Sequence, residues 1–340
     1  MKNKLKKMQS ESLAKSDKVS RKKSHAFSSL ILTFFVLFIL ANMIAFPAKF
    51  ISRSLDGISA WAFNVLPSVL PFMFFTRILS TLGTLSKFTR PLAPLSNKLF
   101  KTPPISIYTF CMAVLSGYPV GSKMVADLFL QGQISKEDAF KMSSFCSTSG
   151  PMFIIGAVGI GMFHSSKVGY ILFLSHMFGA ILNGLLYRNL KIKTEETENI
   201  LNESTKQIQA DNSQKSNFNL ADIVTSSTLA ILSVGCIIAI SFIVIECFSP
   251  LLSLLPQNIA FFVEGLLEIT KGCIDLSTLS NLNASIILTS FVISFGGIST
   301  LLQSLTMLSS IKMPVKLFTL QKFTHACLST LITIVILLIV

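Results

Sequence analysis

The sequence predicts an all-α, polytopic membrane protein made of two related halves, with helices that break inside the bilayer. Three observations lead to this fold class. Hydrophobic residues make up 51% of the 340 residues and charged residues 13%, whereas soluble domains carry about 25% charged residues. Several uncharged stretches reach the roughly 20 residues that a membrane span needs. Glycine and proline interrupt some of these stretches, where they would break a helix.

The N-terminal region has a different character. Residues 1–24 contain nine Lys or Arg and two acidic residues, and we expect a disordered basic tail. Basic segments beside spans mark the cytoplasmic side of a membrane, so this charge indicates topology, not nucleic-acid binding. The uncharged stretch Phe27–Ala48 is too long for the apolar core of a cleaved signal peptide. It is expected to be a retained anchor helix with a cytoplasmic N-terminus.

Residues 25–188 form the predicted first half. A helix kinked by Pro67 and Pro71 comes first, and a basic connector on the cytoplasmic surface follows it. Two broken elements and one continuous span complete this half. The expected elements are Ile51–Leu82, Ser86–Pro104, Ile105–Leu130 (broken at Gly117–Gly121), Lys136–Phe163 (broken at Ser149-Gly150-Pro151) and Val168–Tyr187.

A polar stretch at 189–219 is predicted to be a flexible linker, and residues 220–340 form the second half. The same plan of span, broken element, broken element and span recurs there. Its elements are Ile223–Ile245, Asn258–Ile274, Leu282–Ser309 (broken at Phe295–Ser299) and Val315–Val340. The closing spans share the pattern Leu174-Ser175-His176 and Phe323-Thr324-His325. Whether the two halves are parallel or inverted stays open at this stage.

The break at Ser116–Lys123 lies in a stretch with no charge from Thr102 to Ser122. Backbone groups exposed at membrane depth are tolerated where protein or a water-filled cavity satisfies them, and transporters place their sites there. The spacing does not fit a phosphate loop, which needs four residues between its glycines. We expect helix N-termini at this break to favour an anion, with Lys123 recognising its charge. Pairing of Lys123 with Asp127, or contact with lipid headgroups, is the alternative.

Other polar groups join this candidate site. Glu264 and Glu268, four residues apart, are expected on one helical face, where they could bind a proton or cation, balance the charge of Lys123, or lie exposed at an interface. His176 and His325 are either interhelical hydrogen-bonding residues or a proton relay. The candidate substrate-binding residues are Gly117, Tyr118, Pro119, Gly121, Ser122, Lys123, Ser147, Thr148, Ser149, Gly150, Glu264, Glu268, Thr270, Gly296, Gly297 and Gln303.

No cofactor, metal site or enzyme activity is expected. The sequence contains no H-E-x-x-H or G-x-S-x-G motif and no cluster of His and Cys at ligand spacing. The six cysteines have no C-x-x-C pair and are predicted to be reduced. The expected partners are the lipid bilayer and a small anionic substrate, while a coupling proton or sodium ion and a homo-oligomer stay open.

Several motifs resemble one known family. From about Trp61 onward, the chain is similar to the YlbJ-type sporulation integral membrane proteins of the nucleoside-recognition (Gate) superfamily. The Ser-Gly-Tyr-Pro segment followed by Ser-Gly-Pro is the most specific likeness. The chain departs from it at Ser147-Thr148, where relatives carry asparagines. The motifs are Leu66–Phe72, Ser116–Lys123, Ser149–Val158, Glu264–Gly272 and Phe295-Gly296-Gly297.

This resemblance implies a fold like that of concentrative nucleoside transporters, with broken hairpins around a central site. It also implies a role in spore cortex formation and the export of dipicolinic acid from the mother cell across the outer forespore membrane. Two alternatives remain at this stage. One is a nucleoside or cation carrier, and the other is a membrane scaffold or sensor that transports nothing.

Overall fold

The computed structural model describes residues 29–82, 87, 89–191 and 219–339, and within these residues every regular element is a helix. The expected tail at 1–24 and nearly all of the expected linker at 189–219 lie outside the described residues. The chain divides into two units, residues 1–53 and 54–340. In the first unit the predicted anchor forms the helix Ser29–Ala45, and helix α2 (Pro47–Ala60) begins just before the boundary.

The proline-bearing segment is helical but irregular. A π-helical turn, η1 (Trp61–Val65), joins α2 to α3 (Leu66–Thr81). At its end the Leu66 N–H donates to the Trp61 carbonyl, five residues back instead of four. Pro67 has no N–H to donate, so the irregular turn lies where the regular hydrogen-bond pattern would fail.

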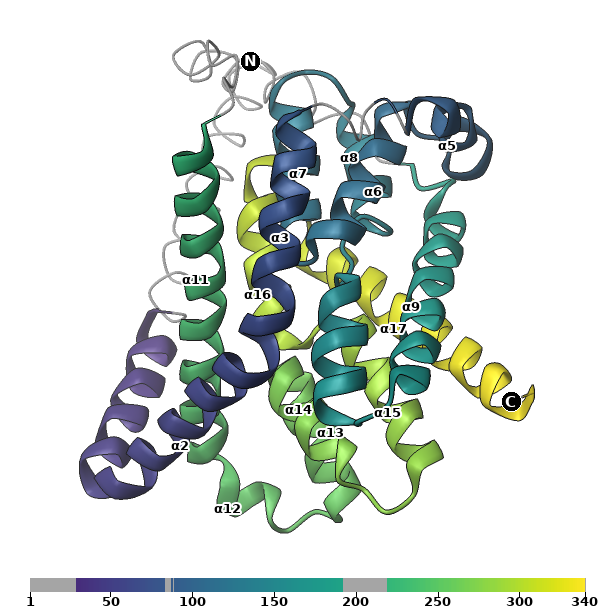
Figure 1. Cartoon of the computed structure of the whole chain (residues 1–340). Helices are drawn as coiled ribbons and strands as arrows, with labels where there is room; N and C mark the ends of the chain where they lie inside the picture. The colour runs from purple at the N-terminus through teal and green to yellow at the C-terminus, as the bar shows by residue number, and fades with distance from the viewer. Residues whose placement is uncertain (1–28, 83–86, 88, 192–218, 340) are drawn as a thin grey trace, which may run out of the picture. The chain divides into compact units, whose positions relative to one another are not determined.

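Two pairs of short helices fold back on themselves as hairpins. In the first half, α6 (Ile105–Ser116) packs against α7 (Val120–Leu130). In the second half, α13 (Gln257–Leu267) packs against α14 (Ile269–Ser277). Figure 1 shows α6 and α7 at the upper end of the 54–340 unit and α13 and α14 at its lower end. The two hairpins therefore enter this unit from opposite ends.

Two other elements are interrupted but continue onward. Helix α8 (Lys136–Ser143) leads through the non-helical stretch 144–150 into the π-helix η3 (Met152–Met162). Helix α15 (Leu282–Phe295) leads through Gly296 into α16 (Gly297–Met307) and η5 (Leu308–Ile311). All predicted breaks in these elements are confirmed, although the first begins earlier than expected, at Ser144.

The remaining elements are mostly long helices. Helices α9 (Ser166–Tyr187) and α17 (Val315–Ile339) pack closely on one another, and α11 (Leu220–Cys247) packs on α3. The short elements are η2 (Arg90–Leu92), α5 (Ala93–Phe100) and α12 (Ser249–Leu252). Five described segments are long and apolar enough to cross a membrane: Pro47–Leu79, Ser166–Tyr187, Leu220–Cys247, Leu282–Ile311 and Val315–Ile339. The prediction of an all-α, polytopic membrane protein is confirmed.

The order of hairpin, interrupted helix and long helix occurs twice along the chain. Because the hairpins come from opposite ends (Figure 1), the two copies are inverted relative to one another. Each hairpin contributes to its own apolar core. One core contains Val125 and Phe129 of α7 with Leu308 of η5, and the other contains Cys273 of α14 with Ile154 of η3 and Leu172 of α9. This arrangement brings the tips of both hairpins toward the middle of the unit.

Candidate functional site

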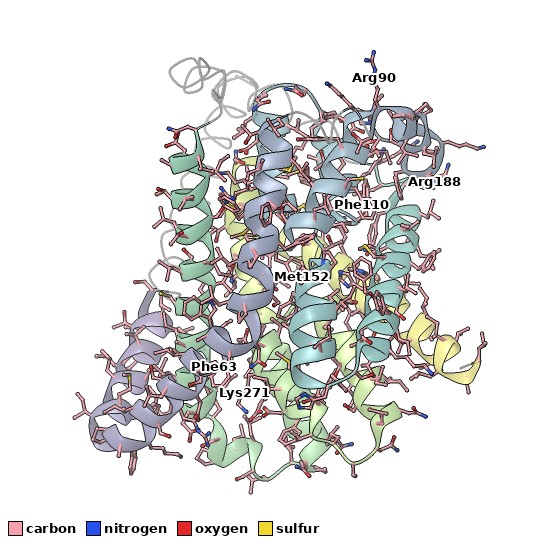
Figure 2. All side chains as sticks on the ribbon, in the orientation of Figure 1. Phe63, Arg90, Phe110, Met152, Arg188 and Lys271 are labelled. Carbon is pink, nitrogen blue, oxygen red and sulfur yellow. The ribbon has the colours of Figure 1, made fainter. Side chains whose placement is uncertain are left out.

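The four breaks meet around one cavity of about 100 Å³. The first hairpin contributes Gly117 and Tyr118, and the stretch 144–150 contributes Ser149 and Gly150. The second half contributes Glu268, Ile269 and Thr270 from its hairpin and Ser299, Thr300 and Gln303 from α16. Apolar residues of α3 and α11, such as Phe72 and Ile238, close the other side. Met152, another lining residue, lies near mid-height in Figure 2.

Glycines allow the breaks to approach one another closely. A Cβ atom on Gly121 would lie 1.8 Å from the Cys146 carbonyl oxygen, and one on Gly117 would lie 3.0 Å from the Gly150 nitrogen. Gly117 also has a φ of 72°, a left-handed conformation that favours glycine. The tip of the first hairpin is thus seated directly on the stretch 144–150.

The second-half breaks are joined in the same way. A Cβ on Gly272 would lie 2.1 Å from the Gly265 Cα, which holds α13 and α14 together. A Cβ on Gly297 would lie 3.2 Å from the Ile269 nitrogen. Across the two halves, a Cβ on Gly296 would lie 3.4 Å from the Cζ atom of Tyr118. The breaks are therefore joined by close backbone contacts within each half and by the Tyr118 ring between the halves.

Side chains from the long helices hold the stretch 144–150. Asn183 of α9 donates to the Ser144 carbonyl at 2.7 Å, and Lys322 of α17 donates to the Ser147 carbonyl at 2.9 Å. The Ser149 N–H donates to Nε2 of His176 at 3.0 Å. Each of these three side chains is at least 97% buried. They satisfy backbone groups that a membrane interior would otherwise leave unpaired.

The two histidines link the halves by hydrogen bonds. Because Nε2 of His176 accepts from Ser149, the neutral ring carries its proton on Nδ1, which lies 2.8 Å from the Ser294 hydroxyl. His325 Nε2 lies 3.0 Å from the His176 carbonyl, which can only accept, and the ring centroids are 4.7 Å apart. The structure therefore gives both histidines the interhelical hydrogen-bonding role.

Lys123 does not occupy the position predicted for it. Helix α7 begins at Val120, so its first turn buries Gly121 and Ser122 and leaves Lys123 exposed. The side chain does not line the cavity. A lysine does lie behind the cavity wall, but it is Lys322, whose Nζ donates to the hydroxyl of Tyr118. Sequence reasoning missed Lys322, although it is a charge in the closing span, three residues before His325.

The two predicted carboxylates are not on one helical face, which corrects that expectation. The backbone at Glu268 is extended, with φ −142° and ψ 121°, so the helix ends before it. Glu268 instead caps α14 by accepting from the Lys271 N–H at 2.7 Å. Glu264, near the end of α13, pairs with the Lys271 ammonium at 2.9 Å. Glu268 is 2% exposed and lies outside the five candidate spans, and this burial raises the pKa of its carboxyl to about 7.

The sixteen candidate residues divide into two groups. Seven line the cavity: Gly117, Tyr118, Ser149, Gly150, Glu268, Thr270 and Gln303. Nine do not: Pro119, Gly121, Ser122, Lys123, Ser147, Thr148, Glu264, Gly296 and Gly297. Several residues of the second group, such as Gly121 and Gly297, allow the close approach of the breaks without lining the cavity. The substrate-binding role of all sixteen stays a prediction. Among the described residues, no group of three or more His, Cys, Asp and Glu side chains could hold a metal ion.

Comparison with known proteins supports the resemblance seen in the motifs. The chain is 32% identical over 169 residues to "Sporulation integral membrane protein YlbJ" of Bacillus subtilis (strain 168). The chain is thus similar, over half of its length, to a YlbJ-type sporulation integral membrane protein. The match covers 50% of this chain and 41% of that relative, so it spans less than half of the relative's length. No family model matches the chain, and no solved structure does, so membership of the Gate superfamily stays a prediction.

Proposed function

We propose that this chain is a carrier that moves a small anion across the membrane through the cavity at the four breaks, and that it is not an enzyme. The observation that carries the proposal is that three helices begin at these breaks with uncapped N-termini. Helices α7, η3 and α16 start at Pro119, Pro151 and Gly296 without a side-chain cap. Helix N-termini carry partial positive charge and unpaired N–H groups, which favour an anion.

The substrate proposed from the family likeness is dipicolinate, a planar aromatic dianion. The apolar side of the cavity, with residues such as Val69, Phe72 and Ile238, suits the face of an aromatic ring. The polar side, with hydroxyls from Ser149 and Ser299, suits carboxylates. Because the relative from Bacillus subtilis is named a sporulation protein, we propose that this chain also acts in sporulation, at the outer forespore membrane.

The proposed orientation follows from charge. Arg90 and Arg188 lie at the α6–α7 end of the 54–340 unit, whereas Lys271 lies in its lower part (Figure 2). Lys98, Lys101, Lys136 and Lys141 belong to the elements that flank the first hairpin. Basic residues gather on the cytoplasmic side of membrane proteins. The α6–α7 end is therefore proposed to face the cytoplasm.

A cation-coupled or nucleoside carrier is the second candidate. Glu268 favours it, since a buried carboxylate in the cavity wall could take up a proton or a cation. The same measurement that tests anion transport can distinguish these possibilities.

The test is uptake by liposomes that contain the purified full chain. Labelled pyridine-2,6-dicarboxylate and labelled uridine are offered with and without proton and sodium gradients, and empty liposomes are the control. Saturable uptake of the dicarboxylate is expected. Uridine uptake alone would replace the proposal with a nucleoside carrier. Uptake of neither compound under any gradient would instead favour a scaffold or sensor.

A further inference from the structure

We propose that Lys322 is the residue that recognises the negative charge of the substrate, by pairing with a carboxylate that displaces the Tyr118 hydroxyl. This inference rests on the proposed anion transport and names the subsite that would serve it. Lys322 lies on α17, outside the breaks, and its side chain extends to two of them. No motif in the sequence assigns it this role.

The surroundings of Lys322 are neutral. Its side chain is 3% exposed, and Nζ donates to the Tyr118 hydroxyl and to the Ser147 carbonyl. Nζ also lies 4.4 Å from the centre of the Tyr118 ring. An ammonium group has three donors, and these contacts supply two neutral acceptors and an aromatic face.

The charge of Lys322 has no carboxylate partner. Lys141 and Lys271 form ion pairs with carboxylates, whereas the contacts of Lys322 within the described part of the chain are with a phenol oxygen, a backbone carbonyl and an aromatic ring. A buried charge without a counter-charge is costly. Such a charge favours the binding of an anion that can reach it.

Two further donors lie in the same stretch of backbone. The hydroxyls of Ser147 and Thr148 are buried and have no hydrogen-bond partner among the residues that the structure describes, and both residues are at least 97% buried. Ser147 also supplies the carbonyl that contacts Lys322. Hydroxyls can donate to a carboxylate, and bonds to an ionised acceptor are about twice as strong as neutral ones. The stretch 144–150 thus contains buried hydroxyl donors in the same residue as, and next to, the carbonyl that contacts Lys322.

Tyr118 connects this subsite to the cavity. The tyrosine lines the cavity, and its hydroxyl accepts a hydrogen bond from Lys322. A carboxylate entering from the cavity would replace the phenol oxygen as the acceptor for Nζ. Since Tyr118 also lies against Gly296, its displacement would change a contact between the first-half and second-half breaks.

The experiment compares Lys322→Met and Lys322→Arg with the wild-type chain, and uses Lys123→Met as the matched control at an exposed lysine. Uptake of labelled pyridine-2,6-dicarboxylate is measured in competition with the unlabelled dicarboxylate and with its uncharged diamide. The wild-type chain is expected to prefer the dicarboxylate, and Lys322→Met should reduce this preference at least tenfold. Lys322→Arg should keep part of it, and Lys123→Met all of it.

A thermal unfolding measurement separates recognition from a structural role. Without ligand, Lys322→Met should unfold at a temperature close to that of the wild-type chain, because the loss of the donor to the Ser147 carbonyl is offset by the removal of a buried charge without a carboxylate partner. The dicarboxylate should raise the unfolding temperature of the wild-type chain and not that of the variant. A lower unfolding temperature in Lys322→Met, together with an unchanged preference for the dicarboxylate, would overturn the inference.

Tyr118→Phe keeps the inference testable if Lys322→Met does not fold. Removing the phenol oxygen takes away the internal acceptor that the substrate must displace, so the KM for the dicarboxylate should fall severalfold. An unchanged or higher KM would overturn the inference while leaving anion transport intact. If the wild-type chain transports no anion, the proposed function fails first, and this inference fails with it.

Discussion

The stretch 144–150 in the first half and the Gly296-Gly297 break in the second half both interrupt a helix beside the cavity, but they are stabilised differently. The first is seven residues long and non-helical, and Asn183, His176 and Lys322 from two long helices hold its backbone. The second is confined to two glycines with φ of 88° and 72°, and its carbonyls accept from the Thr300 hydroxyl four and three residues ahead.

This difference teaches that the two breaks depend on different parts of the chain. The first-half break needs residues that are 27 to 175 positions away in sequence, so a change in α9 or α17 should alter its geometry. The second-half break is local, and Glu268 caps the neighbouring hairpin from within. The first half is therefore expected to be the more sensitive to distant substitutions.

The largest effect is expected where the first hairpin is seated on the stretch 144–150. Gly121→Ala places a methyl group 1.8 Å from the Cys146 carbonyl oxygen, and the backbone must move to relieve the clash. The free energy of unfolding should fall by more than about 3 kcal/mol, measured as folded yield and unfolding temperature in detergent. Gly150→Ala is the matched control, because its nearest neighbours lie at 3.5 Å. Equal stability of the two variants would contradict the close approach at Gly121.

The next largest effect is expected from substitutions that compare the stretch 144–150 directly with the Gly296-Gly297 break. Asn183→Ala removes two bonds donated to the Ser144 and Gln321 carbonyls and one accepted from Thr324. It should cost about 2–4 kcal/mol of unfolding free energy, because buried groups are left unpaired. Thr300→Val in the second half removes one local donor and should cost about 1 kcal/mol. A larger loss in Thr300→Val would reverse the proposed contrast.

A pH dependence is expected from the second half. The pKa of Glu268 is about 7 in the folded chain, raised by burial from 4.5, so the folded chain binds a proton more tightly than the unfolded chain. The free energy of unfolding should therefore decrease as pH rises from about 5 to about 7. Glu268→Gln, whose amide oxygen can still cap α14, should flatten this slope in thermal unfolding at several pH values. A slope of unchanged size in the variant would show that other groups cause it.

The smallest effect is expected at Lys123, the residue that the sequence suggested for charge recognition. Lys123→Ala changes an exposed side chain outside the cavity, so stability should stay within about 0.5 kcal/mol. Transport in liposomes should match that of the wild-type chain. Loss of transport with normal membrane abundance would show that Lys123 reaches the substrate in another conformation.

The positions of three of the four breaks could be predicted from the sequence because their cause is local, whereas the break at Glu268 was expected to be helical. Gly117, Gly150 and Gly296 interrupt uncharged apolar stretches, and each lies next to, or two residues from, a proline or a second glycine, a combination that favours a helix break. The shared pattern around His176 and His325 predicted the internal repeat, but the contact between the two histidines is visible only in the structure. The inverted order of the halves could not, because a hairpin and a crossing helix of similar length have the same composition.

Side-chain roles were harder to predict than breaks. Lys123 adjoins a break in sequence, but the direction of α7 takes its side chain away from the cavity. Lys322 reaches the break through space, and only the packing of α17 against the stretch 144–150 reveals it. Glu264 and Glu268 have helical spacing, yet the carboxylate of Glu268 ends one helix and starts the next. In each case a tertiary contact decided which residue faces the site.

His176 has a consequence of its own. One nitrogen accepts from the broken backbone of the first half, and the other meets a hydroxyl that lies two residues before the glycine break of the second half. A single imidazole ring therefore contacts both breaks. It can accept from Ser149 and donate to Ser294 only when its one proton is on Nδ1. If either break opens, the ring loses a partner and its hold on the other break is altered as well. Movements of the two halves are therefore expected to be coupled through this one side chain.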